Sequence, residues 1–238
     1  MQLGPKQFSP LYPIIDLTVF HGPLEPLLVT LTRAGVNLIQ LRGKSVSSKS
    51  LFNQCTQLVS LAQPRSLRVI VNDRVDLAWL SSADGVHLGQ DDLPCEEARK
   101  MLGDDATIGL STHNLEQARA AENSPADYVA IGPVFPTQSK ENPDPIVSSR
   151  ELQAIRKSVS KPLIAIGGIT TENVLPLFDL GVDSVAVIRD VILAPDILRQ
   201  ATSFMELALK VKPWHRFSRT DSIDRPLISP NLNDPGSK

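Results

Sequence analysis

The stretch Gly132-Pro133-Val134-Phe135-Pro136-Thr137-Gln138-Ser139-Lys140 shapes the interpretation of the whole chain. It follows a short apolar run, residues 128–131, and opens with Gly and Pro, which is typical of a strand that ends in a long loop. The loop carries two hydroxyls and an ammonium, from Thr137, Ser139 and Lys140. Hydroxyl and backbone N–H groups donate hydrogen bonds and Lys adds a positive charge, so the stretch predicts an anion site at a strand end.

A unit of one strand and one helix recurs on both sides of this stretch. Residues 11–15 form an apolar run that ends at Asp16, and leucines 24, 27, 28 and 31 then fall on one helical face before Ala34-Gly35 ends the helix. Strand candidates begin near eight positions: Tyr12, Val36, Leu67, Asp84, Ala106, Asp127, Pro162 and Asp183. Eight strands that alternate with eight helices predict an α/β fold, a single (β/α)8 TIM barrel. A doubly wound open sheet is the alternative, but no GxGxxG motif follows the first strand.

Several helix starts can be read from capping residues. Pro94 precedes two glutamates, and Asn114 has Gln117 three residues later, which is typical of a capping box. Thr170 or Thr171 is a candidate cap for the helix after the seventh strand. The segments after the second and sixth strands are the longest, and loops longer than a fold requires are often functional.

The barrel is expected to span residues 11–212. Residues 1–10 form an N-terminal extension without the apolar core of a signal peptide, and residues 213–238 form a tail rich in Pro, Ser and Asp that we expect to be disordered. No apolar run is long enough to span a membrane. With 24 Lys+Arg against 26 Asp+Glu, the chain lacks the broad basic face that binds nucleic acid. We therefore expect small-molecule partners, with a homo-oligomer left open.

The two cysteines, Cys55 and Cys95, form no CxxC motif and no metal-ligand spacing. We expect free thiols in a reducing cytosol, which places the protein in the cytoplasm. His21, His87 and His215 likewise form no ligand spacing, so no zinc site is predicted.

Polar residues follow nearly every predicted strand, and the active site of a barrel gathers at those strand ends. The ends carry these segments: Gln40-Leu41-Arg42-Gly43-Lys44, Asn72-Asp73, Gly89-Gln90-Asp91-Asp92, Ser111-Thr112-His113-Asn114, Gly167-Gly168 and Ile188-Arg189-Asp190. Strand alternation aims Gln40, Arg42 and Lys44 the same way.

The charges at these ends suit a phosphorylated substrate. Arg42, Lys44 and Lys140 are enough to hold a diphosphate-like group. Asp73 and Asp92 fit Mg²⁺, which proteins usually bind with one or two carboxylates plus substrate phosphate oxygens. The glycine pair before a predicted helix start is a second, monophosphate site.

Each of these residues also has a purely structural interpretation. Asp73 with Arg74 and Asp76 is compatible with a helix cap and salt bridges, and Asp92 with a turn before a helix. His113 is interpreted as a loop or capping residue. Because several strand ends carry polar residues together, we favour the functional interpretation of these residues over the structural one.

Taken together, these strand-end motifs resemble thiamine-phosphate synthase, in that family's order and at close to its spacings, over residues 11–210. The resemblance implies an enzyme of thiamine biosynthesis, a transferase that joins hydroxymethylpyrimidine diphosphate to a thiazole phosphate and releases pyrophosphate. In that family the diphosphate leaves first, and the thiazole nitrogen captures the pyrimidine cation. The sister group, the thiazole tautomerases, shares the fold.

The resemblance also implies roles for single residues. Arg42, Lys44 and Lys140 would stabilise the leaving diphosphate, with Mg²⁺ on Asp73 and Asp92. Further residues would bind the two substrates, the pyrimidine through Gln40, Asn72 and Ser111, and the thiazole phosphate through Thr137, Ser139, Gly168, Ile188 and Arg189.

The chain departs from the family pattern in the thiazole half. Ser139 stands where a second Thr is usual, and Arg189 where a Ser is usual. The alternatives are a tautomerase-like isomerase with His113 as its acid–base residue, or a barrel that binds a thiamine precursor without turnover. The segment Gln90-Asp91-Asp92 with Arg42 and Lys44 favours the synthase, because an isomerase has little use for a metal-binding carboxylate pair. Asp73, Asp92 and Lys140 count against the barrel without turnover.

Overall fold

The computed structural model describes residues 8–137 and 144–211, and it is a closed parallel barrel. Each strand pairs with the next in chain order, and β8 pairs with β1 to close the ring. The strands are β1 (Leu11–Asp16), β2 (Leu38–Arg42), β3 (Arg68–Asn72), β4 (Gly85–Leu88), β5 (Thr107–Thr112), β6 (Tyr128–Ile131), β7 (Leu163–Ile166) and β8 (Ser184–Val187). The predicted TIM barrel is confirmed, and all eight predicted strand starts lie within two residues of the observed ones.

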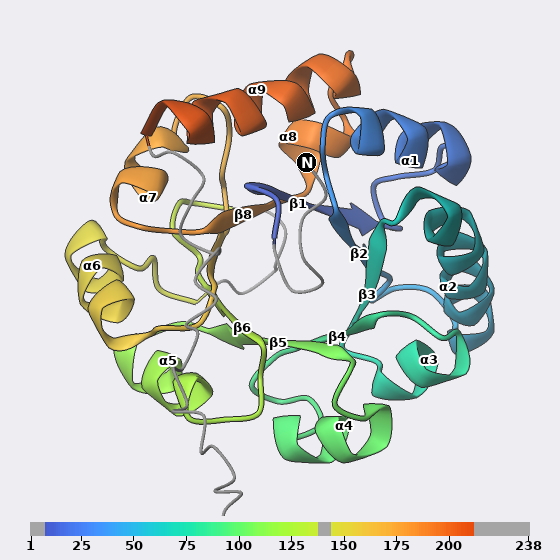
Figure 1. The fold of residues 1–238 in the computed structure, drawn as a ribbon, viewed down its shortest axis with the longest axis horizontal. Coiled ribbons are helices and arrows are strands. Elements are labelled where there is room, and N and C mark those ends of the chain that lie inside the picture. Colours follow the sequence, from blue (N-terminus) through green and yellow to red (C-terminus); the bar gives the residue numbers. More distant parts are fainter. Residues whose placement is uncertain (1–7, 138–143, 212–238) are drawn as a thin grey trace, which may run out of the picture.

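The helices form a ring outside the strands (Figure 1). They are α1 (Leu24–Arg33), α2 (Ser48–Ala62), α3 (Val75–Leu80), α4 (Cys95–Leu102), α5 (Leu115–Glu122), α6 (Ser149–Ser158), α7 (Leu175–Asp179), α8 (Arg189–Ile192) and α9 (Ile197–Val211), with a 3₁₀ turn, η1 (Gln63–Arg65), after α2. The expected count of eight helices is wrong within the described residues, because the short α8 lies between β8 and the long last helix.

The capping predictions are confirmed in part. Asn114 caps α5, because its side chain accepts a hydrogen bond from the Gln117 N–H at 2.9 Å. Gly35 follows α1 with φ +88°, a backbone conformation that glycine adopts without strain. The threonine caps are wrong: α7 begins at Leu175, and the Thr170 N–H instead donates to Asn173 Oδ1 at 2.8 Å within the preceding turn.

Strand alternation separates the core into two layers. Outward-facing residues such as Ile39 and Leu41 pack with the helices in one continuous apolar cluster. Inward-facing residues form a second cluster that fills the barrel, with Tyr12 and Tyr128 among its largest fully buried side chains. The interior is therefore packed, and a ligand can reach the barrel only at its ends.

Three further expectations concern the chain as a whole. The division into an extension, a barrel and a tail stays a prediction, and residues 213–238 lie outside the described residues. Cys55 and Cys95 are free thiols, as expected, and both are buried. Among the described residues, no helix is both long and apolar enough to cross a membrane.

Candidate active site at the carboxyl ends of the strands

The last inward-facing residues of neighbouring strands bring the predicted polar groups to one end of the barrel. In β2 the inward residues are Leu38, which lies in the interior cluster, then Gln40 and Arg42. In β3 the same alternation places Asn72 inward, two residues after Ile70. The predicted grouping of these side chains at the carboxyl end follows directly from the parallel register.

Arg42 is held by an acid that sequence reasoning did not assign to the site. Its guanidinium donates to Asp16 Oδ2, and the two residues are register partners at the ends of β1 and β2. The Asp16 side chain is only 4% exposed, and its Oδ1 accepts from the N–H and hydroxyl of Thr18 at 2.9 and 2.7 Å. One carboxylate thus joins the β1–α1 loop to the cation on β2, and the sequence signal was an acid directly after an apolar strand.

Lys44, two residues after Arg42 in the chain, forms a charged group with Asp73 and Asp92. Lys44 Nζ lies 3.4 Å from Asp73 Oδ2. Burial and the adjacent charge of Asp92 raise the pKa of Asp73, and Lys44 opposes that rise. The Asp92 carboxylate accepts from the Gly89 N–H at 2.6 Å, which fixes the turn that presents it.

The backbone at Asp73 is strained. Its φ is +64°, in the left-handed region that non-glycine residues seldom occupy, and its N–H donates to the His87 carbonyl at 2.8 Å. Arg74, not Asp73, is the residue before α3, and Arg74 pairs with Asp76 at 2.6 Å. The helix-cap interpretation of Asp73 is therefore wrong, and the strain is of the kind found at functional sites.

These two carboxylates fit a divalent cation in chemistry and in number. In the described part of the chain no group of three or more His, Cys, Asp or Glu side chains gathers as a metal site. A pair of neighbouring carboxylates whose mutual repulsion raises the pKa of one of them is a place where a cation is stabilising. Mg²⁺ needs no more than such a pair when a phosphate supplies further oxygens.

The other side of the barrel mouth is built from backbone. Gly168 follows β7 with φ +63°, and a Cβ there would lie 2.3 Å from the Pro136 carbonyl oxygen. Ile188 follows β8 and leads into α8, whose first residue, Arg189, is exposed. Thr137 is half-buried near the start of the β6–α6 loop, while Ser139 and Lys140 lie outside the described residues.

A buried polar network lies beneath the mouth, and sequence reasoning missed most of it. His87 Nε2 lies 2.8 Å from Ser111 Oγ, and His87 Nδ1 lies 2.8 Å from the Tyr128 hydroxyl. The Tyr128 hydroxyl lies 3.2 Å from the Tyr12 hydroxyl, and the Tyr12 hydroxyl accepts a hydrogen bond from Gln40 Nε2 at 3.0 Å. The available signal was a histidine inside a buried strand, where it points into the barrel interior.

His113 secures the long β6–α6 loop. Its Nδ1 lies 2.6 Å from the Gly132 carbonyl oxygen and 3.4 Å from Asp144 Oδ2, on the two sides of that loop. Its backbone N–H donates to Gln117 Oε1 at 2.7 Å. His113 is a loop residue, as one of the two expected structural interpretations has it, whereas the cap of α5 is Asn114.

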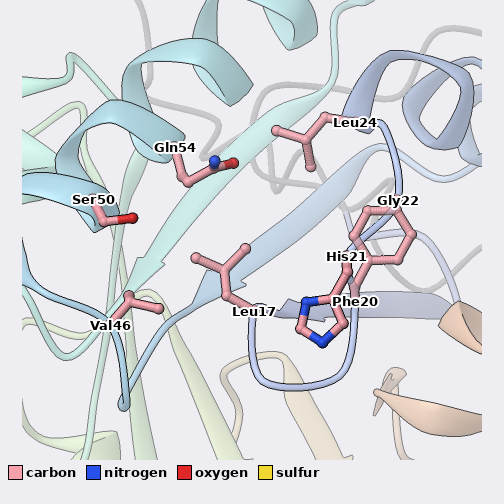
Figure 2. Close-up of a pocket in the computed structure, with 8 residues that line it drawn as sticks. All are labelled: Leu17, Phe20, His21, Gly22, Leu24, Val46, Ser50 and Gln54. Atoms are coloured by element: carbon pink, nitrogen blue, oxygen red, sulfur yellow. The ribbon is translucent and has the colours of Figure 1, made fainter.

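Two hollows border the mouth. One, of about 270 Å³, lies between the β1–α1 loop and α2, and Figure 2 shows Leu17 between Gln54 on the helix and His21 on the loop. The other, of about 390 Å³, is lined by Val134, Phe135 and residues of α6 and α7. None of the predicted site residues lines either hollow, so the chemistry of the strand ends is the better guide to the site.

The chain is similar in sequence to proteins of one family. The sequence pattern of a family described as thiamine monophosphate synthase matches residues 11–191. The thiamine-phosphate synthase of Koribacter versatilis (strain Ellin345) is 45% identical over 204 residues, which is 83% of this chain and 94% of that protein. The thiamine-phosphate synthase of Chlorobium phaeovibrioides is 46% identical over 162 residues, 68% of this chain and 78% of that protein.

A solved structure agrees with these sequences. The thiamine phosphate pyrophosphorylase of Pyrococcus furiosus superposes with a TM-score of 0.76 at 30% identity. The match covers 86% of this chain and 98% of that one, so the similarity extends over the whole barrel.

Proposed function

The chain belongs to the thiamine monophosphate synthase family and is a transferase that forms thiamine phosphate in thiamine biosynthesis. We propose that the reaction proceeds through loss of diphosphate from a pyrimidine substrate. In this proposal, cations at the ends of β2 and β6 stabilise the departing diphosphate. The substrates are hydroxymethylpyrimidine diphosphate and a thiazole phosphate. The C–O bond to the diphosphate breaks with its electron pair, and the thiazole nitrogen then forms the new C–N bond to the pyrimidine cation. The products are thiamine phosphate and pyrophosphate.

Catalysis of this step requires stronger interactions with the departing diphosphate than with the bound substrate. Arg42 offers a planar fork of donors held in place by Asp16, and Lys44 adds a mobile point charge. Lys140, on the loop after β6, is the third proposed cation. A bond that breaks by charge separation needs no general base, and accordingly none is assigned.

The metal in this proposal is Mg²⁺, held by Asp73 and Asp92. When bound, it would supply positive charge to the leaving diphosphate. Without it, Asp73 and Asp92 repel each other, and Lys44 is the nearest compensating charge. Two acids in contact with the ammonium of Lys44 support a site for a metal–diphosphate complex rather than for a bare anion.

The two substrates are assigned to opposite sides of the mouth. Gln40, Asn72 and Ser111 are proposed to bind the pyrimidine, above the buried network. The thiazole phosphate is proposed to lie against the β6 to β8 ends, at Thr137, Ser139, Gly168, Ile188 and Arg189. A cytoplasmic location and a homo-oligomer stay predictions.

The proposal rests chiefly on the contact of Lys44 with Asp73, whose carboxylate is adjacent to that of Asp92. The test is pyrophosphate release by the purified protein with the pyrimidine diphosphate, the thiazole phosphate and Mg²⁺, each omitted in turn. We expect pyrophosphate and thiamine phosphate in equal amounts only when all three are present. Turnover that persists in EDTA would contradict the metal assignment, and an absence of thiamine phosphate from folded protein would contradict the reaction.

The isomerase alternative is not favoured. It would use His113 as its acid–base residue, but His113 Nδ1 contacts the backbone of the β6–α6 loop at 2.6 Å. The Asp73–Asp92 pair also has no role in an isomerase.

A further inference from the structure

We infer that the buried network beneath the active site is a chain of hydrogen bonds with one fixed direction, and that this direction makes Ser111 a donor toward the substrate. The inner members of the chain are then positioning residues for the reaction: Tyr12, Tyr128 and His87. The link to a substrate rests on the proposed function, whereas the direction of the chain does not.

The direction starts at Gln40. Its Nε2 donates to the Tyr12 hydroxyl at 3.0 Å, so the single proton of that hydroxyl is available for the next member. The next member is Tyr128, whose hydroxyl oxygen lies 3.2 Å away. Because the Tyr12 oxygen already accepts from Gln40, we assign Tyr12 as the donor of this bond and Tyr128 as its acceptor. Tyr128 can then direct its own proton to His87 Nδ1, at 2.8 Å.

The same assignment of donors and acceptors extends through the imidazole ring of His87. A neutral histidine carries one N–H, and a Nδ1 that accepts from Tyr128 requires the proton to lie on Nε2. Nε2 then donates to Ser111 Oγ at 2.8 Å. Because the serine oxygen accepts this bond, its own proton points elsewhere, toward a ligand with a lone pair such as a ring nitrogen.

The opposite direction would have a different consequence. If His87 carried its proton on Nδ1, it would donate to Tyr128, and Ser111 would have to donate to Nε2. Ser111 could then only accept from a ligand. The two directions therefore select ligands of opposite hydrogen-bonding character at Ser111.

The surroundings keep the chain in place and its phenols neutral. Burial raises the pKa of both Tyr12 and Tyr128, so each hydroxyl retains the proton that the chain requires. The Tyr128 ring stacks on His87 with centroids 5.6 Å apart. It also occupies the space beside Gly109, where a Cβ would lie 1.9 Å from Tyr128 Cζ. A side chain at residue 109 would displace the ring.

The direct test is the tautomer of His87, measured by ¹⁵N NMR on the labelled full chain. The chain has four histidines, and the signal of His87 is the one lost in His87→Gln. We expect a single tautomer with the proton on Nε2 and a hydrogen-bonded Nδ1 that carries no proton. A proton on Nδ1 would overturn the inference.

A matched pair of variants tests the consequence for the substrate. In His87→Gln the amide nitrogen reaches the place of Nε2 and still donates to Ser111, whereas the shorter side chain of His87→Asn does not reach it. We expect the KM for the pyrimidine diphosphate to rise about 10-fold in His87→Asn and much less in His87→Gln. The KM for the thiazole phosphate should not change in either. Equal effects of the two variants, or equal effects on both substrates, would contradict the positioning role.

A second pair of variants covers the case in which His87→Asn does not fold. Tyr128→Phe removes the donor to Nδ1, so the His87 ring should become a mixture of tautomers with averaged ¹⁵N shifts. Phe8→Leu removes packing from the same Tyr128 ring, whose centroid is 5.2 Å away, but removes no hydrogen bond, and should leave one tautomer. An unchanged tautomer in Tyr128→Phe would overturn the direction. A wild-type protein with the Nε2 tautomer but no thiamine phosphate would contradict the proposed function alone.

Discussion

The two halves of the barrel mouth are constructed in different ways. The half at the β1 to β4 ends consists of charged side chains that hold one another, with Asp16 on Arg42 and Lys44 on Asp73. The half at the β7 and β8 ends consists of backbone that approaches closely, with Gly168 against the Pro136 carbonyl. We conclude that charge should determine substrate binding in the first half, whereas the shape of the backbone should determine it in the second half. Substitutions in one half should therefore affect one substrate and not the other.

The largest effect is expected from Asp92→Ala in the charged half. Loss of a proposed metal ligand should lower kcat by about 10³-fold, because the charge developing on the diphosphate loses its main compensation. Steady-state pyrophosphate release measures this. Asp91→Ala, at the exposed neighbouring acid, is the control and should keep full activity. Unchanged turnover in Asp92→Ala would remove this residue from the site.

In the half of the mouth that consists of backbone, Gly168→Ala should weaken binding of the thiazole phosphate. The added Cβ would meet the Pro136 oxygen at 2.3 Å in a left-handed conformation, and we expect the KM for the thiazole phosphate to rise about 10²-fold. Gly103→Ala is the matched control, since Gly103 also has a positive φ, +82°, but nothing lies within 4 Å of a Cβ there. A similar rise in KM in both variants would mean that backbone strain, not the site, is responsible.

Asp16→Asn should have a smaller effect, confined to the charged half. The amide keeps an oxygen for Thr18 but loses the charged partner of Arg42, so the KM for the pyrimidine diphosphate should rise about 10-fold. Asp76→Asn, which breaks the more exposed pair with Arg74, is the control. An equal change in the KM for the thiazole phosphate would show that the two halves are not independent.

The smallest effect is expected from alkylation of the two buried thiols, Cys55 on α2 and Cys95 on α4. Burial raises the pKa of Cys55 to about 11, so at pH 8 about one molecule in 10³ carries its thiolate. Burial likewise raises the pKa of Cys95. Native protein should therefore resist iodoacetamide at pH 8, by mass spectrometry, and label only after unfolding. Rapid labelling of the native protein would contradict the burial of these thiols.

The sequence was sufficient for the barrel and for most residues at its mouth, for identifiable reasons. An apolar run followed by polar residues marks the end of each strand, and alternation gives the direction of residues such as Gln40 and Arg42. The threonine caps failed because the Thr170 N–H donates to Asn173 Oδ1 within a turn, and α7 begins only after that turn, at Leu175.

The missed residues are those whose role depends on a distant partner. Tyr12 and Tyr128 are 116 positions apart, and an aromatic residue in a buried strand usually indicates only packing. His87 lacks metal-ligand spacing, and its partners come from β5 and β6. Only the closed barrel brings these side chains together, so no pattern along the chain could have shown their contacts.

The proposed chemistry depends most on the Asp73–Asp92 pair as a metal site. The most direct measurement is the binding of Mn²⁺, as a substitute for Mg²⁺, by electron paramagnetic resonance in the presence of pyrophosphate. We predict one bound Mn²⁺ for each chain in the wild-type protein, and loss of that ion in a double variant, Asp73→Asn with Asp92→Asn, that remains folded. Equal Mn²⁺ binding by the double variant and the wild-type protein would contradict the account.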